Sequence, residues 1–218
     1  MTGYVISWQQ PDIENYPGCC IYLHGTLSRN ERLYCIIFYT SDLHFGHANA
    51  IKFDERPFTD VDDMADGMIH NWNSRVGKND TVYILGDFCF KLKDPEPILA
   101  RLKGHKRLIL GNHDQVIMGS EKLQSYFDDI QKMDYVSDRG KLIVMCHFPI
   151  AEWNKKKSGA YHFYGHIHKS SPEVYSFMTG QGRAYNVGCM INNYMPCTAD
   201  EIIRNNEIYQ ARLQSEAK

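Results

Sequence analysis

The hydrophobic pattern of this chain alternates between short apolar runs and segments in which apolar residues recur with helical spacing. The runs are four or five residues long and rich in β-branched and aromatic side chains, which is typical of buried strands. We therefore predict strands at 35–39, 81–85, 106–110, 142–146 and 161–164.

Three segments between these runs have the pattern of helices. Asp60 is expected to cap a core-facing helix that ends near Gly77, because apolar residues recur there at helical spacing: Val61, Met64, Met68, Ile69 and Trp72. A second helix is predicted from Asp94 to Gly104, with Pro95 at its first position, and a weaker one over 120–126. The order of strand, helix, strand and helix favours an α/β fold.

The remaining segments have weaker patterns. We expect a loop over 48–57, strands over 174–177 and 183–188, a short helix over 199–204 and a last strand over 207–209. Residues 1–33 hold candidate strands at 4–6 and 20–23, but glycine and proline interrupt them. This segment could pack on the domain, bind a partner or be a poorly ordered leader. The expected division is an extension of unknown role over 1–33, one domain over 34–212 and a tail over 213–218.

Each of the five predicted strands is followed by residues that bind metal ions in proteins. Asp42 and His44 come after the first strand, and their side chains project to one face in extended backbone. A carboxylate oxygen beside an imidazole nitrogen suits a first-row metal. The other runs lead to Asp87, to Asn112-His113-Asp114, to His147, and to His166-x-His168. Ligands bind at the carboxyl ends of strands in open α/β sheets, so the repetition predicts a polynuclear metal site.

The same residues carry a resemblance. The series Asp42-x-His44, Gly86-Asp87, Gly111-Asn112-His113-Asp114, His147 and Gly165-His166-x-His168 resembles the calcineurin-like metallophosphoesterase family, with all five blocks present in order. The resemblance implies an α/β sandwich, in which two β-sheets are flanked by helices and a dinuclear metal site lies at the carboxyl ends of the strands. It assigns residues 34–212 to a calcineurin-like phosphoesterase domain.

The resemblance also implies how two metal ions are held. Asp87 would bridge them. One ion would take Asp42, His44, Asp87 and His168, and the other Asp87, Asn112, His147 and His166. Manganese is the expected metal, because mixed carboxylate and imidazole ligands suit it, with iron, zinc, nickel or magnesium as alternatives. The implied reaction is hydrolysis of a phosphomonoester or phosphodiester by a hydroxide that bridges the metals.

Residues next to these blocks are candidates for catalysis or substrate binding. By resemblance, His113 lies over the phosphate, where it stabilises the transition state or protonates the leaving oxygen, and Asn112 also contacts substrate. Asp114 would either orient His113 or cap a helix. His47 is close enough in sequence to touch substrate, and Arg56 could form a fork on a phosphate or be an exposed structural arginine. Lys155-Lys156-Lys157 would either steer anions or be solvated.

Composition limits the function classes. The formal net charge is −2 over 218 residues, so no basic excess demands nucleic acid or an acidic membrane surface. We see no signal peptide and no membrane-spanning run, and we expect a cytoplasmic protein of unknown oligomeric state with a small or nucleotide-like phosphate ester as substrate. A nuclease with the same metal site is an alternative. An inactive binding module is another, although it would be expected to have substituted ligands.

Overall fold

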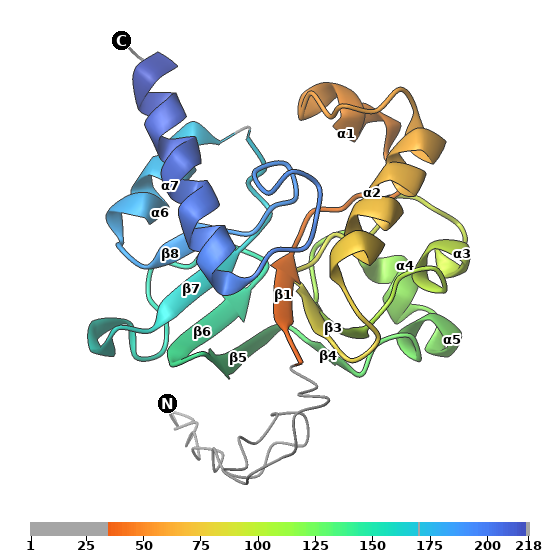
Figure 1. Ribbon diagram of the computed structural model, residues 1–218, viewed down its shortest axis with the longest axis horizontal. Helices are drawn as coiled ribbons and strands as arrows, with labels where there is room; N and C mark the ends of the chain where they lie inside the picture. The colour runs from red at the N-terminus through yellow and green to blue at the C-terminus, as the bar shows by residue number, and fades with distance from the viewer. Residues whose placement is uncertain (1–34, 170, 217–218) are drawn as a thin grey trace, which may run out of the picture. The chain divides into compact units, whose positions relative to one another are not determined.

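A computed structural model describes residues 35–169 and 171–216 of the chain. The predicted extension over 1–33 and its candidate strands lie outside the described residues. Within the described part, the chain forms two four-stranded sheets accompanied by helices, which is a mixed α/β fold (Figure 1). No helix in residues 35–169 and 171–216 combines the length and apolar character needed to cross a lipid bilayer.

The first sheet is fully parallel and has the strand order β1-β2-β3-β4. Its strands are Ile37–Thr40, Thr81–Ile84, His105–Ile109 and Asp129–Gln131. The second sheet has the order β5-β6-β7-β8, with an antiparallel hairpin between β5 and β6 followed by parallel pairs. Its strands are Met133–Asp138, Lys141–Cys146, Tyr161–Tyr164 and Ala184–Asn186.

Side chains that alternate along the strands build two different packing surfaces. Tyr39, Tyr83, Ile109, Met145 and Phe163 belong to a core that both sheets share. The rings of Tyr39 and Phe163 meet edge to face with centroids 5.0 Å apart. Their neighbours in sequence belong to a second core that also contains helix residues: Phe38, Val82, Ile84, Leu108, Val144 and Tyr164. Because successive side chains of a strand point to opposite faces of its sheet, one face of each sheet packs against the other sheet and the opposite face packs against helices.

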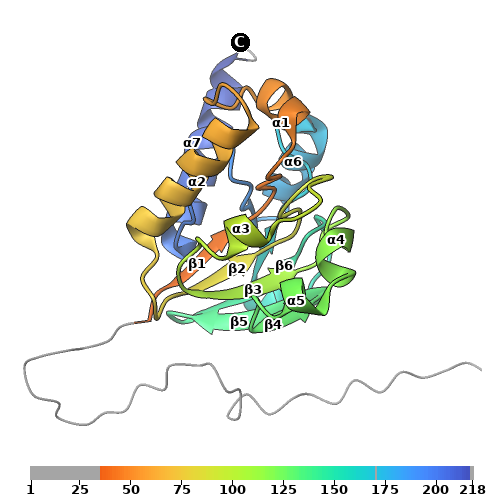
Figure 2. The same ribbon diagram turned by 90° about the vertical axis from the view of Figure 1, so that its right-hand side faces the viewer.

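The helices lie in the connections between strands. Figures 1 and 2 show α3, α4 and α5 beside β3 and β4, whereas α6 and α7 accompany the second sheet. Within residues 35–169 and 171–216, the α-helices are α1 Ala48–Phe53, α2 Val61–Arg75, α3 Glu96–Leu99, α4 Gln115–Met118, α5 Glu121–Gln124, α6 Pro172–Gly180 and α7 Ala199–Glu216.

Several sequence predictions are confirmed. The five predicted strands correspond to β1, β2, β3, β6 and β7, and 183–188 contains β8. Helix α2 begins after Asp60, whose carboxylate accepts hydrogen bonds from the backbone N–H groups of Asp62 and Asp63. The helix after Asp94 is shorter than predicted, since α3 ends at Leu99.

Other predictions were wrong. The expected loop over 48–57 begins with α1, and the expected strand over 174–177 lies inside α6, which buries Tyr175 and Met178 three residues apart. Helix α7 continues through the expected strand 207–209 and into the expected tail. Its inward side follows a spacing of four, three and four residues, at Ile202, Asn206, Tyr209 and Leu213. Strands β4 and β5 were not predicted because their side chains are mostly half-buried and do not form an apolar run.

Candidate metal centre

The carboxyl ends of five strands deliver the candidate ligands. In the loops after β1 and β2, the backbone N–H of Asp42 donates to the carbonyl of Gly86 (3.1 Å), and that of His44 to the carbonyl of Asp87 (3.0 Å). Most of the ligand candidates adopt positive φ angles, which side chains of L-residues rarely do. They are Asp42 (56°), His44 (51°), Asp87 (55°), His166 (71°) and His168 (47°). Such strain gathers at functional sites and is maintained by the surrounding structure.

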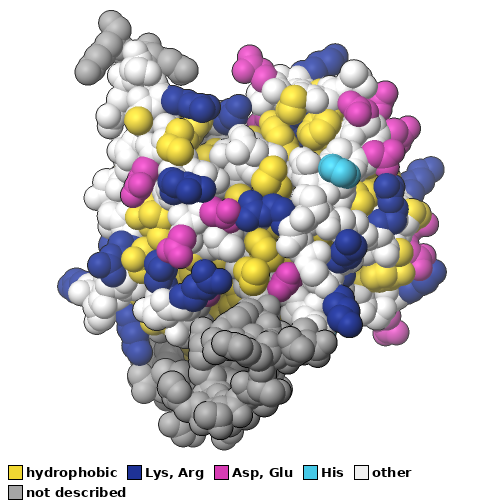
Figure 3. All heavy atoms as spheres, in the orientation of Figure 1, with side chains coloured by type: hydrophobic (Ala, Val, Ile, Leu, Met, Phe, Trp, Pro, Cys, Tyr) yellow, Lys and Arg dark blue, Asp and Glu magenta, His cyan; other side chains and the backbone are white. Residues whose placement is uncertain are grey.

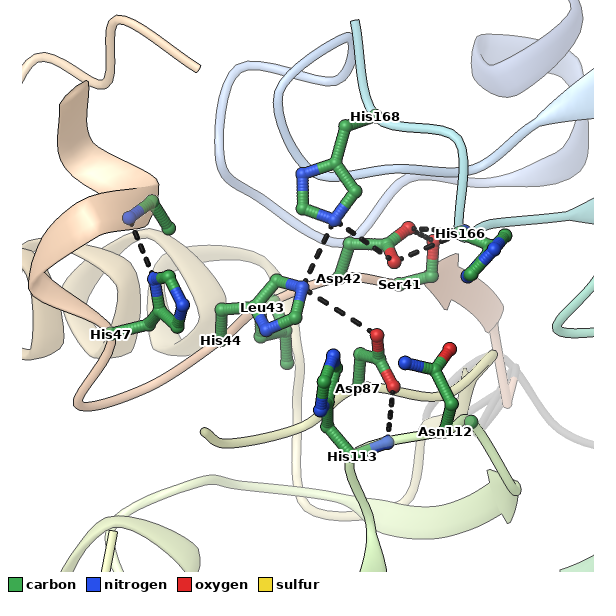
Figure 4. Close-up of polar contacts among 12 residues, drawn as sticks. Ser41, Asp42, Leu43, His44, His47, Asp87, Asn112, His113, His166 and His168 are labelled. Carbon is green, nitrogen blue, oxygen red and sulfur yellow. Dashed lines mark hydrogen bonds and ion pairs between the residues drawn. The ribbon is translucent and has the colours of Figure 1, made fainter. Parts of the chain in front are cut away.

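The side chains converge in two groups. The first group is Asp42, His44 and His168, and the second is Asp87, His147 and His166; in each, one ligand atom per residue lies within 4.8 Å of the others. In the first group, the Nε2 atoms of His44 and His168 are 3.0 Å apart, and His168 Nε2 is 3.6 Å from Asp42 Oδ1 (Figure 4). In the second group, His147 Nε2 lies 3.6 Å from Asp87 Oδ2 and 3.0 Å from Asn112 Oδ1. Asn112 therefore extends the second group.

Asp87 lies between the two groups. Its Oδ2 atom is 3.6 Å from Nε2 of His44 and also 3.6 Å from Nε2 of His147. Its Oδ1 atom accepts a hydrogen bond from the backbone N–H of His113 (2.9 Å), which fixes the carboxylate from the other side (Figure 4). One carboxylate oxygen is therefore within reach of both groups, as a bridging ligand must be.

The protonation of His44 and the ring orientation of His147 match a role as metal ligands. Burial lowers the pKa of His44 to about 2, so its ring is neutral and offers a lone pair. His147 directs Nδ1 to the carbonyl of Leu85 (2.8 Å), which leaves Nε2 to face Asp87. Burial lowers the pKa of His168, but the hydrogen bond to Asp54 and the charges of Asp42 and Asp54 raise it overall.

Asp54 is a site residue that the sequence did not reveal. It is 2% exposed, and both of its carboxylate oxygens lie within 3.1 Å of Nδ1 of His168. Its position inside the expected loop carried no signal except a charged Asp-x-Arg spacing with Arg56. The contact with His168 spans 114 residues and depends on tertiary structure.

Of the two predicted roles of Arg56, its contacts fit the structural one. The side chain is buried rather than exposed, and its donors point inward to Asp54, to the carbonyl oxygens of Asp42 and Leu43, and to the sulfur of Met64. The Nε, Nη1 and Nη2 atoms of the guanidinium all have partners within the protein, so it cannot form a bidentate contact with a phosphate. Its donors are therefore not available to a substrate phosphate.

The predicted roles of Asp114 are not what its contacts show. It is 1% exposed and accepts hydrogen bonds from the backbone N–H groups of Asp87, Phe88 and Gly111, at 2.8 to 3.0 Å. It occupies the N-cap position of α4, as one of the predicted roles required, but its side chain makes no cap bond to that helix. Among the described residues, no hydrogen bond joins it to His113. Asp114 instead ties the loop after β3 to the loop after β2.

His113 and His47 lie beside the first group. The ring of His113 is half-buried, with its centroid 5.5 Å from that of His44 and 4.7 Å from that of Phe90. His47 caps α1 by accepting the backbone N–H of Ala50 at Nδ1 (2.7 Å), and its ring centroid is 3.9 Å from that of Phe90. The ring centroid of His47 is also 5.5 Å from that of His44, so both imidazoles are neighbours of this ligand candidate.

The lysine run is only partly free. Lys156 donates to the carbonyl of Ala151 and to Gln181, and its Nζ lies 4.5 Å from the centre of the Trp153 ring. Trp153 itself is 5% exposed, and its indole N–H donates to the carbonyl of Ala160. Lys155 and Lys157 are exposed.

Comparison with known proteins places the chain in a family. No family model matches it. The uncharacterized protein MJ1445 of Methanocaldococcus jannaschii is 31% identical over 171 residues, which cover 77% of this chain and 89% of the archaeal protein. The chain belongs to the MJ1445 family. The gene 66 protein of Mycobacterium phage D29 is 28% identical over 160 residues, covering 61% of this chain and 78% of the phage protein.

One solved structure supports the fold of this MJ1445-family chain. The crystal structure of AQ665, a protein of unknown function from Aquifex aeolicus, aligns with a TM-score of 0.62 over 78% of this chain and 99% of that chain, at 24% identity. At this level of identity the likeness shows a shared fold.

The donor set of this MJ1445-family protein fits divalent cations. Two buried carboxylates, Asp42 and Asp87, stand among imidazoles, and burial raises the pKa of Asp87. Cationic charge placed between the groups would offset the cost of keeping these carboxylates ionised away from water. Oxygen and nitrogen ligands at this spacing suit manganese, iron, zinc or nickel.

Proposed function

We propose that the chain is a metal-dependent phosphoesterase of the calcineurin-like metallophosphoesterase type. The observation that carries the proposal is the position of Asp87 Oδ2, 3.6 Å from a ligand nitrogen of each group. A shared carboxylate oxygen of this kind is what a two-metal site for phosphoryl transfer requires. Asp42, His44 and His168 would hold one cation, and Asn112, His147 and His166 the other, with Asp87 common to both.

The chain's own residues would divide the work of hydrolysis. When bound, two cations would supply Lewis acidity and lower the pKa of a water. Asn112 contributes a neutral oxygen, so it adds a ligand without adding negative charge to the site. His113, beside the first group, protonates the leaving oxygen. His47, fixed by its bond to Ala50, offers its remaining ring nitrogen to the substrate.

The proposed substrate is a nucleotide-like phosphodiester, because phenylalanine rings flank the centre. Phe148 is 44% exposed, and its ring lies 4.9 Å from that of His147 and 4.7 Å from that of His166. Phe90 is half-buried between His47 and His113 on the side of the first group. Aromatic side chains stack with nucleobases, each stack contributing about 1–3 kcal/mol.

The nuclease alternative has less support. The formal net charge of −2 gives no basic excess for a nucleic acid strand, and on the one face drawn in Figure 3 basic and acidic side chains are interspersed. Trp153, which could have stacked on a nucleic acid strand, is buried. The metal centre itself is equally suited to a small diester and to a nucleic acid. Substrates of different length therefore distinguish the two functions.

The proposal is tested by hydrolysis of p-nitrophenyl phosphate and bis-p-nitrophenyl phosphate by metal-stripped protein reloaded with Mn²⁺. We expect the diester to be cleaved faster, and Asp87→Asn to reduce the rate by more than about 100-fold, since the bridging ligand is lost. Faster cleavage of single-stranded DNA or RNA than of any small diester would favour the nuclease. Absence of hydrolysis with manganese, iron, zinc, nickel and magnesium would refute catalysis.

The aromatic contact is tested with Phe148→Leu, which keeps an apolar side chain but removes the ring. We expect KM for thymidine 5′-(p-nitrophenyl phosphate) to rise about 10-fold and KM for methyl p-nitrophenyl phosphate to change little, because only the first carries a base. Phe177→Leu on α6, which is 54% exposed, is the matched control. Equal changes for both substrates would argue against base stacking.

A further inference from the structure

A buried ion pair lies behind the first group. The Asp54 and Arg56 side chains are 3% and 0% exposed, and Arg56 Nη2 lies 2.9 Å from Asp54 Oδ2. Asp54 is the C-cap residue of α1, and Arg56 follows two residues later. Removing two charges from water costs several kcal/mol per ion before their attraction is counted, so a buried pair is weak evidence for stability alone. The contacts of this pair give it a more specific role.

Asp54 fixes one ligand of the first group. Its oxygens lie 3.1 and 3.0 Å from Nδ1 of His168. Figure 4 shows Nε2 of His168 turned to His44 and Asp42, with the other ring nitrogen turned away. A carboxylate that accepts the Nδ1 proton sets the tautomer and the orientation of the ring, and Nε2 is left with its lone pair toward a metal.

Arg56 fixes the backbone that carries the other two ligands. Its Nη1 atom donates to the carbonyl of Leu43 (2.7 Å), and its Nη2 atom to the carbonyl of Asp42 (3.0 Å). These carbonyls belong to the turn between Asp42 and His44, where both ligands have positive φ. A guanidinium with fixed fork geometry therefore holds a backbone conformation that is otherwise unfavourable.

We infer that Asp54 and Arg56 are positioning residues that organise one of the two metal positions. Together they contact all three members of the first group: His168 through its ring, and Asp42 and His44 through their shared turn. Among the described hydrogen bonds, none joins the pair to Asp87, His147, His166 or Asn112. Loss of the pair therefore lowers the metal affinity of the first group and leaves that of the second unchanged. This inference rests on the proposed two-metal site.

The test is a Mn²⁺ titration of metal-stripped protein by calorimetry, with the number of bound ions counted by equilibrium dialysis. We expect two ions per wild-type chain. In Asp54→Asn, which keeps the size of the side chain, we expect one ion to bind about 10–100-fold more weakly and the other as before, since loss of a ligand's hydrogen-bond partner typically has this effect. Asp54→Glu, which retains the charge, should recover part of the loss.

Controls separate positioning from general stability. Glu201→Gln breaks the partly buried pair in which Arg75 Nη2 meets both oxygens of Glu201 at 2.7 Å, between α2 and α7, and should leave both metal affinities unchanged. If Asp54→Asn unfolds, the double variant Asp54→Asn, Arg56→Gln avoids the unpaired charge and should show the same selective loss.

The outcomes are distinguishable from failure of the proposed function. Two ions in the wild-type protein and unchanged affinities in the folded Asp54 variants would overturn the positioning role and leave the two-metal site standing. Equal weakening of both ions would also overturn it, because the effect would then be general. A wild-type protein that binds fewer than two ions would overturn the site on which the inference rests.

Discussion

At the scale of single residues, the candidate ligands occupy a backbone conformation that their side chains disfavour. Asp42, His44, Asp87, His166 and His168 all have φ between 47° and 71°. Each such residue costs roughly 1–3 kcal/mol. Local hydrogen bonds offset part of this, for example those from Ser41 Oγ (2.6 Å) and from the backbone N–H of His166 (3.0 Å) to the carboxylate of Asp42.

This strain predicts a conflict between stability and metal binding at His166. Its side chain is exposed, so His166→Gly removes little packing while glycine adopts φ of 71° freely. Without metal, we expect the free energy of unfolding of His166→Gly to be about 1 kcal/mol higher than that of His166→Ala, because alanine keeps a Cβ atom. Both should lose affinity at the second group. Urea denaturation measures the difference, and an alanine variant as stable as the glycine variant would show that the backbone is not strained.

The buried ring of His162 should make the stability of the fold depend on pH, independently of the metal ligands. Its Nδ1–H donates to the carbonyl of Val144 (3.1 Å), and its Nε2 accepts the N–H of Ile150 (3.2 Å). Burial lowers its pKa to about 4. The folded state therefore favours the neutral ring, and this stability is complete above the unfolded pKa and is lost as pH falls toward 4.

The expected loss between pH 7 and pH 5 is about 2 kcal/mol from this residue, for an unfolded pKa near 6.5. Glutamine in His162→Gln cannot titrate. Between pH 7 and pH 5, we therefore expect the free energy of unfolding of this variant to fall by about 2 kcal/mol less than that of the wild-type protein. Identical slopes for variant and wild-type protein would mean that His162 is not held neutral.

The sequence predicted the candidate ligands better than the residues that support them. Asp42, His44, Asp87, His147 and the histidines after β7 follow apolar runs, so a local pattern was enough to propose that they meet. Asp54, Asp114 and Arg56 act through buried contacts with distant segments. The sequence did not single out Asp54, and it did not reveal the contacts of Asp114 and Arg56, because an isolated charged residue in a sequence carries no record of its burial.

At the scale of elements, the turns after the strands are packed against one another. A Cβ atom at Gly86, where φ is 85°, would collide with Nδ1 of His147 and lie 2.7 Å from the backbone of Gly111. The loops after β2, β3 and β6 therefore approach one another so closely that only glycine fits. This contact brings Asp87 next to His147.

Gly86→Ala is predicted to damage both the fold and the second group. We expect it to destabilise the protein by about 1–3 kcal/mol more than Gly140→Ala, since overpacking adds to the cost of the backbone conformation. Gly140 is the matched control because φ is 80° and nothing lies within 4 Å of its added Cβ. Thermal unfolding with and without Mn²⁺ measures both effects. Equal destabilisation would mean that the turns can move apart.

Strands were predictable where they are buried on both faces, and helices where a cap and a spacing coincide, as at Asp60 and α2. Helix α6 was mistaken for a strand because Val174, Tyr175 and Phe177 favour strands by type, while its inward spacing spans only Tyr175 and Met178. The polar residues of α7 hid its length, since its buried side includes Asn206.

At the scale of the whole molecule, two sheets bring distant segments to one centre. β1, β2 and β3 supply Asp42, His44, Asp87 and Asn112 from the first sheet, and β6 and β7 supply His147, His166 and His168 from the second. The α/β class could be predicted from alternation along the chain. The division into two sheets came only with the resemblance, and the antiparallel pairing of β5 with β6 was not predicted, because polar edge strands give no clear pattern.

Electron paramagnetic resonance of the Mn²⁺-loaded protein, with the bound ions counted, would show most directly whether Asp87 links two metal ions. We expect two Mn²⁺ ions per wild-type chain with the spectrum of an exchange-coupled pair, and loss of the coupling in Asp87→Asn. A single ion, two uncoupled ions in the wild-type protein, or a coupled pair that persists in Asp87→Asn would contradict this role of Asp87.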